Sequence, residues 1–145
     1  MKSLLNPWHS KLEMSKYDEA WHRADMADEL AEYYEAKGLI DTWSELSDVV
    51  YTYSRAIWTG HTTITFPFSR FAFFLGALYM FPKYTLRWRF FRTLGHQFDK
   101  ELKISEVRNP KKIAKLKDIA EKYNLDPELF VQRAESLMKN RLFFK

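Results

Sequence analysis

Four acidic residues in the first third of the chain have the types and spacing to bind a metal ion. Glu29 and Glu32 form one pair, and Glu45 and Asp48 form a second pair after a spacer of 12 residues. Residues three apart share a helix face, so each pair directs two carboxylates the same way. On two antiparallel helices the four carboxylates would meet, and a hard divalent cation would relieve their repulsion. We therefore predict a Mg²⁺ centre, with Mn²⁺ as an alternative ion.

Each pair also has an ordinary explanation, because acidic residues are common on solvent-exposed helices. Glu45 fits a capping box in which its side chain reaches back to the Thr42 amide. Two observations favour the metal centre. Apolar residues such as Leu46 and Val49 flank the second pair, and both pairs lie at similar offsets from Gly38. Asp25, one turn before Glu29, is expected to be a solvated residue.

The segments that hold the acids are predicted to be helices. Apolar residues recur at helical spacing over residues 15–37 and 42–59, and Gly38 is expected at C′ of the first helix. Alternating strand patterns are almost absent, so we predict an all-α fold. Further helices are expected over residues 68–80, 84–98, 110–123 and 127–141.

Two proline-containing segments make sharper predictions. Pro82 should break or kink the helical run, because proline lacks the N–H that an interior helical position donates. Asp126 followed by Pro127 has the pattern of an N-cap and the first helical residue, so the last helix should begin there.

Length and composition bound the class of protein. The chain has 145 residues, which favours one domain spanning residues 1–145. It has no cysteine, which excludes a disulfide scaffold and thiolate metal sites. The longest apolar run, residues 66–81, is interrupted by proline and arginine, and residues 1–12 lack a signal-peptide pattern. We therefore expect a cytoplasmic protein that does not span a membrane.

Charge is distributed unevenly along the chain. Residues 1–50 hold 11 acidic and 5 basic residues, whereas residues 51–145 hold 8 acidic and 18 basic residues. One part could bind cations and the other anions, although most of these charges are expected to be solvated. The four histidines lack the HExxH spacing, and no P-loop, GxGxxG or GxSxG motif is present.

The two acidic motifs resemble the metal-binding helices of the MazG-like superfamily. These are all-α nucleoside triphosphate pyrophosphohydrolases, with dimeric dUTPases and dCTP pyrophosphatases among them. The similarity is carried by Asp28-Glu-Leu-Ala-Glu32 and Trp43-Ser-Glu-Leu-Ser-Asp-Val-Val-Tyr51, within residues 20–55. Asp126-Pro-Glu-Leu-Phe130 and the segment 134–141 are similar to a late helix of that family. The aromatic residues 66–98 are not a family hallmark, and we interpret them as an insertion of a phage-type member.

The resemblance implies a Mg²⁺-dependent reaction in which a nucleoside triphosphate and water give the monophosphate and pyrophosphate. Such an enzyme acts in nucleotide-pool control, in the host cytoplasm if it is phage-encoded. The four acids would hold the metal, and Glu32 would also orient the attacking water. The late helix would supply charge and hydrogen bonds to the phosphates through Lys139, Asn140 and Arg141. Cations at a helix C-terminus have an equal alternative role, the interaction with the helix dipole.

Further substrate contacts are expected from residues on the second helix. Arg55 would contact phosphate or form a salt bridge, and Trp43 would stack on the base or pack in the core. The resemblance also implies a homodimer or homotetramer, in which a MazG-like helical bundle is completed by oligomerisation. Substrate preference leans to deoxynucleotides, with no base selected.

Two other functions stay open at this point. The basic part of the chain, with Arg87, Arg89 and Arg92 among aromatic residues, could belong to a non-enzymatic helical module that binds nucleic acid. The same arginines could equally lie along an amphipathic helix or in a subunit interface. A weaker alternative is association with a membrane surface through residues 66–98.

Overall fold

The protein is described from a computed structural model, which covers residues 8–10, 16–103 and 109–139. Within these residues all regular structure is helical and no strand is present, which confirms the predicted all-α class. The chain divides into two compact units. The described residues of the first are 8–10 and 16–83, and those of the second are 84–103 and 109–139. Each unit is described by itself.

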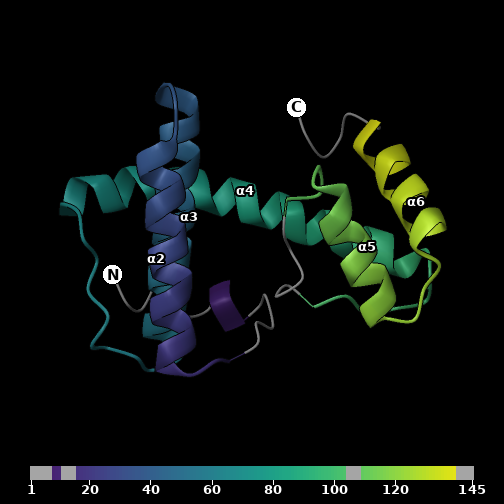
Figure 1. The fold of residues 1–145 in the computed structure, drawn as a ribbon, viewed down its shortest axis with the longest axis horizontal. Coiled ribbons are helices and arrows are strands. Elements are labelled where there is room, and N and C mark those ends of the chain that lie inside the picture. Colours follow the sequence, from purple (N-terminus) through teal and green to yellow (C-terminus); the bar gives the residue numbers. More distant parts are fainter. Residues whose placement is uncertain (1–7, 11–15, 104–108, 140–145) are drawn as a thin grey trace. The chain divides into compact units, whose positions relative to one another are not determined.

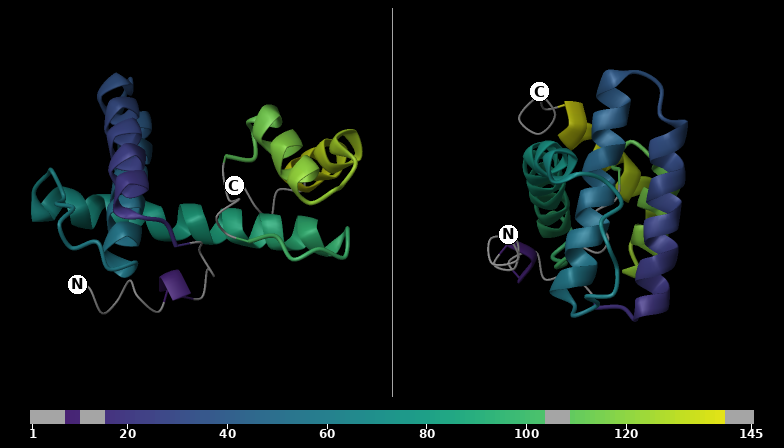
Figure 2. Two further views of the ribbon diagram at one scale, coloured as in Figure 1. Left: turned by 60° about the horizontal axis from the view of Figure 1, so that its bottom comes forward. Right: turned by 90° about the vertical axis from the view of Figure 1, so that its left-hand side faces the viewer.

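The first unit is built on a helical hairpin. Helices α2 (Glu19–Glu35) and α3 (Leu39–Trp58) lie side by side and are joined by a short turn (Figures 1 and 2). Asp18 begins α2 as its N-cap, because its carboxylate accepts a hydrogen bond from the Trp21 amide at 2.8 Å. Because α2 and α3 pack side by side across a short turn, the two helices are antiparallel, as the prediction for the four acids required.

Gly38 has a different role from the one expected of it. It is the N-cap residue of α3, with φ 88° and ψ 159°, and α2 already ends at Glu35. The predicted C′ position is therefore wrong. The positive φ explains why a glycine stands at the turn, since other residues adopt this backbone conformation at a cost.

One face of the hairpin is closed by an apolar cluster. The irregular segment between α3 and the next helix brings Ile64, Phe66 and Phe68 back against it. The buried members are Met26, Val49, Ala56 and Ile64, with Leu30, Tyr33, Tyr53, Phe66 and Phe68 packed against them. These contacts fix α2 and α3 relative to each other, which matters for any site between them.

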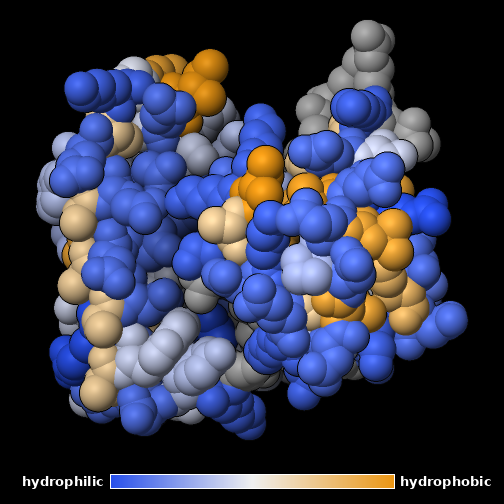
Figure 3. All heavy atoms as spheres, turned by 45° about the vertical axis from the view of Figure 1, so that its right-hand side comes forward, coloured by the Kyte–Doolittle hydropathy of each residue, from blue (hydrophilic) through white to orange (hydrophobic). Residues whose placement is uncertain are grey.

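Another face of α2 is apolar but exposed. Ala20, Ala24, Ala27 and Ala31 are all exposed, and they follow one another at spacings of four and three residues. Figure 3 shows pale apolar residues in a line along this helix. The apolar spacing in this segment predicted a helix correctly. Part of the apolar face of that helix, however, does not enter the core.

Helix α4 (Arg70–His96) continues through Pro82, so the predicted break there is wrong. Proline cannot donate to the carbonyl four residues earlier, which is that of Leu78. Leu78 lies at an exposed position, with 52% of its surface accessible, so water can reach this side of the helix. The missing hydrogen bond is therefore tolerated, and one helix replaces the two expected.

The first part of α4 packs tightly on α3 at Gly76. A Cβ atom on Gly76 would lie 2.6 Å from Val50 Cγ2 and 3.0 Å from the Leu46 carbonyl oxygen. No larger residue fits this approach without a shift of its neighbours. The Trp43 indole N–H also donates to the Leu75 carbonyl at 2.7 Å. These two contacts hold α4 against the segment of α3 that carries the second acidic pair.

The second unit contains the rest of α4 and the contacting helices α5 (Ile113–Lys122) and α6 (Pro127–Lys139). Asp126 caps α6, since its carboxylate accepts from the Leu129 amide at 2.8 Å. The predicted start of the last helix is confirmed. The core of this unit includes Phe90, Leu94, Leu116, Ile119, Phe130 and Ala134.

No helix among the described residues is long and apolar enough to cross a bilayer.

Candidate metal centre

A line of polar side chains from both helices runs along the contact between α2 and α3. The His22 ring contacts the Thr59 hydroxyl, with 3.0 Å between Nε2 and Oγ1. One turn further along α2, Asp25 Oδ2 accepts a hydrogen bond from the Thr52 hydroxyl at 3.0 Å. The acidic residues follow at the next positions toward the turn of the hairpin. These hydrogen bonds set the register that brings the acids level with one another.

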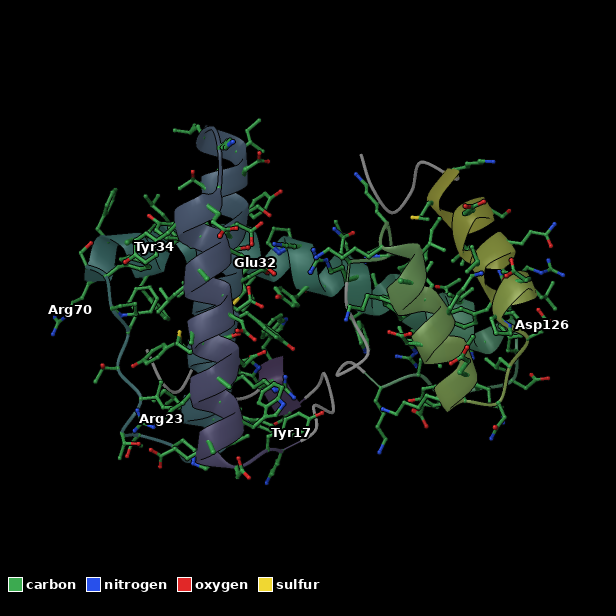
Figure 4. All side chains as sticks on the ribbon, viewed as in Figure 1. Tyr17, Arg23, Glu32, Tyr34, Arg70 and Asp126 are labelled. Atoms are coloured by element: carbon green, nitrogen blue, oxygen red, sulfur yellow. The ribbon has the colours of Figure 1, made fainter. Side chains whose placement is uncertain are left out.

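Three of the four predicted metal ligands meet. Glu29, Glu32 and Glu45 each offer a carboxylate oxygen, and the three oxygens lie within 4.8 Å of one another. Glu29 and Glu45 are half-buried and Glu32 is exposed, so the group has a dry side and a side open to solvent. Figure 4 labels Glu32 on α2, well separated along the hairpin from Tyr17 at the other end.

Electrostatics in this group act mainly on Glu29. Its pKa is raised from 4.5 to about 8, first by burial and then by neighbouring acids, which are Asp48, Asp25, Glu32 and Glu45. Burial disfavours the charged form, and nearby negative charges disfavour it further. Without a cation, Glu29 therefore holds a proton near neutral pH.

The structure does not bring the fourth predicted ligand, Asp48, into this group of oxygens. Its Oδ2 lies 2.6 Å from Lys83 Nζ, and both side chains are largely buried, with 12% and 10% of their surfaces exposed. Lys83 was not recognised as a candidate from the sequence. A signal existed, because it is the only charged residue between Arg70 and Arg87, and a lone charge in an apolar helix needs a partner.

Two of the ordinary explanations fail in the structure. Thr42 lies within the first turn of α3, where its hydroxyl donates to the Gly38 carbonyl at 2.9 Å, so it is not an N-cap and Glu45 is not part of a capping box. Asp25 is half-buried and accepts the hydrogen bond from Thr52, so the expectation of a solvated residue is wrong.

Arg55 is buried at the other end of the polar line. Its guanidinium carbon lies 4.8 Å from the ring centroids of both Tyr17 and Trp21, and these two rings stack on each other at 4.0 Å. This is the geometry of a cation–π contact. Since Arg55 follows Asp48 by seven residues, it lies on the same face of α3, two turns away.

Trp43, the other candidate on α3, is held by α4. Besides its hydrogen bond to Leu75, its ring lies 5.3 Å from that of Tyr79. The side chain keeps 39% of its surface exposed. It is therefore fixed in orientation while part of the ring still faces solvent.

The candidates from the late helix belong to the second unit. Lys139 is the last residue of α6 and is exposed. Asn140 and Arg141 lie outside the described residues. The contact of these three residues with a phosphate chain stays a prediction.

Two buried histidines add to the electrostatics of the first unit. His9 Nε2 lies 2.8 Å from the Ser54 hydroxyl, and burial, followed by the charge of Arg55, lowers the pKa of this histidine to about 3. Burial, then Arg55 and then His61, lowers the pKa of His22 to about 4. Both rings are therefore neutral at physiological pH.

Comparison with known proteins does not add to this picture. The chain matches no protein-family model, no curated protein and no solved structure. The MazG-like resemblance therefore stays a prediction from the sequence motifs alone.

Proposed function

We propose that the protein is a Mg²⁺-dependent pyrophosphohydrolase that converts a (deoxy)nucleoside triphosphate to the monophosphate and pyrophosphate. The observation that carries the proposal is the group of carboxylate oxygens from Glu29, Glu32 and Glu45, within 4.8 Å of one another. The three side chains come from two helices whose register is fixed by packing and hydrogen bonds. Glu29 and Glu45 are half-buried between these helices, which supports a site more than acids on a fully solvated surface would.

The donor set fits a hard divalent cation. All three groups are carboxylates, which Mg²⁺ and Mn²⁺ accept as ligands. Oxygens on opposite sides of a Mg²⁺ ion lie roughly 4.2 Å apart, twice the usual ligand distance of about 2.1 Å. The 4.8 Å limit on the separation of the carboxylate oxygens is close to this value, so small side-chain rotations suffice. A bound ion would also displace the Glu29 proton and offset the repulsion among the three carboxylates.

The three acids would share the work unequally. Glu29 and Glu45, which are half-buried, would hold the ion, and Glu32, which is exposed, would orient the attacking water and accept its proton. The water oxygen bonds to the α-phosphorus while the bond from that phosphorus to the α–β bridging oxygen breaks, and pyrophosphate leaves. When bound, the cation supplies charge neutralisation to the phosphate chain and a lower pKa for its water ligand.

Other residues would bind the rest of the substrate. We assign phosphate binding to Lys139, Asn140 and Arg141, as the resemblance implies. Arg55 and Trp43 remain candidates for phosphate and base contacts, respectively. Deoxynucleotides are the favoured class, without a choice of base. The proposed role is control of the nucleotide pool in the cytoplasm, that of the host if the protein is phage-encoded.

A homo-oligomer is part of the same proposal. The exposed alanine line on α2 is an apolar helix face that a second copy of the chain would cover, completing a MazG-like bundle. We expect light scattering to give the mass of a dimer or tetramer, and Ala27→Glu to lower it. A wild-type mass of one chain would contradict this part of the proposal.

The test of the proposed reaction is a product assay on a panel of canonical and modified (d)NTPs with Mg²⁺. Pyrophosphate, not orthophosphate, is the expected product for at least one of them. Glu32→Gln should lower kcat at least about 100-fold, the usual contribution of a general base. Glu35→Gln is the matched control, since Glu35 is exposed on the same helix and is not among the gathered acids.

The same preparation separates the proposal from the nucleic-acid module. Arg87 and Arg92 each lie 5.3 Å from a ring of their own helix, that of Tyr84 or Trp88, which fits arginines packed along a helix. A filter-binding titration with salt tests the alternative. Salt-dependent nucleic-acid binding without any triphosphate hydrolysis would favour it.

A further inference from the structure

Lys83 is bound more closely than an ordinary surface lysine. Besides Asp48 Oδ2 at 2.6 Å, its ammonium lies 2.9 Å from the Ser44 hydroxyl and 3.1 Å from the Ser44 carbonyl oxygen, with Ser47 Oγ at 3.3 Å. An ammonium group has three hydrogens, so these acceptors fully occupy it. The lysine, which belongs to α4, is thus a fixed positive charge beside the segment of α3 that carries Glu45 and Asp48.

The packing of α4 explains why the charge stays there. Gly76 allows α4 to approach α3 closely, and Lys83 follows Gly76 by seven residues, which places it on the same face of α4 two turns later. Trp43 also ties the turn of α4 at Leu75, next to Gly76, to α3. The packing of α4 on α3 therefore places Lys83 beside Asp48. Because that packing does not depend on the lysine charge, a variant without the charge should keep α4 in place.

The position of Asp48 makes this charge relevant to the metal centre. Asp48 follows Glu45 by three residues on α3, so the two side chains share a face. A second divalent ion beside the first, at the separation of roughly 3.5–4 Å found in two-metal sites, would need an additional carboxylate of this kind. Lys83 already neutralises that carboxylate, and a cation in the same place would be repelled.

We propose that Lys83 is a built-in cation that occupies Asp48 and limits the centre of Glu29, Glu32 and Glu45 to one divalent ion. The proposal rests on the metal centre of the proposed function and adds its metal count. Lys83 acts through Asp48 and is a positioning residue, not a catalytic one. Removing its charge should turn Asp48 into a metal ligand and open a second site.

The experiment is a calorimetric Mn²⁺ titration of the full chain, which measures metal binding without turnover. Wild type should bind one ion per chain, and Lys83→Met should bind two. Lys83→Arg, which keeps the charge, should stay at one. In Lys83→Met/Asp48→Asn the added site should disappear, because the amide that replaces Asp48 carries no charge for the ion.

Lys83→Gln is a second variant that removes the charge but retains a hydrogen-bonding group, in case the methionine destabilises the buried aspartate. Two ions in wild type, or one ion in both Lys83→Gln and Lys83→Met, would overturn the proposal. Failure of the metal centre itself has a different signature. Wild type would then bind no Mn²⁺, or bind it as well after Glu29→Gln, and the proposed function would fall together with the role of Lys83.

Discussion

The Thr52 hydroxyl donates a hydrogen bond of 3.0 Å to the Asp25 carboxylate, across the contact between α2 and α3 and one turn from Glu29. This bond joins positions 27 residues apart in the sequence. Together with the contact of His22 and Thr59, it holds the two helices in the register that brings Glu29, Glu32 and Glu45 together. The hairpin is thus aligned by polar contacts as well as by its apolar cluster.

Removing the hydrogen bond between Thr52 and Asp25 should lower the free energy of unfolding by a measurable amount. Thr52→Val keeps the shape of the side chain but removes the donor to a charged, half-buried acceptor. We expect the free energy of unfolding to fall by about 1–3 kcal/mol. The check is urea denaturation followed by circular dichroism. Thr62→Val, at an exposed turn position, serves as the control and should change stability by less than about 0.5 kcal/mol.

The raised pKa of Glu29 predicts a pH dependence of the metal-free protein. The folded chain binds the Glu29 proton up to about pH 8, whereas the unfolded chain releases it near 4.5. This contribution to stability is complete below pH 4.5 and is lost as pH rises through about 8. In EDTA, the melting temperature of wild type should therefore fall across this range relative to that of Glu29→Gln, which stays neutral throughout.

Mg²⁺ should reverse this loss. A cation displaces the proton and stabilises the ionised carboxylate, so the rise in melting temperature on adding Mg²⁺ should be largest at the alkaline end of the range. If the melting temperatures of wild type and Glu29→Gln in EDTA change with pH in the same way, the raised pKa of Glu29 is contradicted.

The buried histidines predict the opposite trend in acid. Because burial lowers the pKa of His22 from 6.5 to about 4, the unfolded chain binds more protons than the folded chain between these values. The contribution of neutral His22 to stability is therefore complete above pH 6.5 and is lost as pH falls toward 4. His22→Gln should flatten the acid limb of the melting profile, whereas His96→Gln, at an exposed position, should leave it unchanged.

Arg55 should be sensitive even to a change that keeps its charge. Its planar guanidinium lies over both Tyr17 and Trp21, and a lysine ammonium cannot reproduce that contact. We expect Arg55→Lys to lower the free energy of unfolding by about 1–2 kcal/mol. Arg23→Lys, on the exposed side of α2, provides the comparison, and an equal loss in both variants would argue against the stacking.

The parts of the fold that follow local rules were predictable from the sequence. The two helices around Gly38 and the Asp126 cap depend on spacing and on residues within a few positions of one another. The grouping of Glu29, Glu32 and Glu45 followed once the hairpin was antiparallel. These predictions needed only the periodicity of a helix and the chemistry of its ends.

One local prediction failed, since Gly38 begins α3 instead of ending α2. The other predictions that failed depend on tertiary surroundings. Whether Pro82 ends a helix depends on how exposed the orphaned carbonyl is. The partner of Asp48 is Lys83, which lies 35 residues away in the sequence. Lys83 is on α4, and Gly76 sets how closely α4 approaches α3. Asp25 looked like a solvated acid because its hydrogen-bond donor lies on the neighbouring helix. Sequence patterns give no distances across such contacts.

The most direct test of the account is pyrophosphate release from the (d)NTP panel by the wild-type chain, with Mg²⁺ and with EDTA, beside Glu29→Gln. The account predicts release that requires Mg²⁺ and is lost in the variant, while circular dichroism shows that the variant is folded. Release that is equal in EDTA or undiminished in folded Glu29→Gln, or no release from any triphosphate, would contradict it.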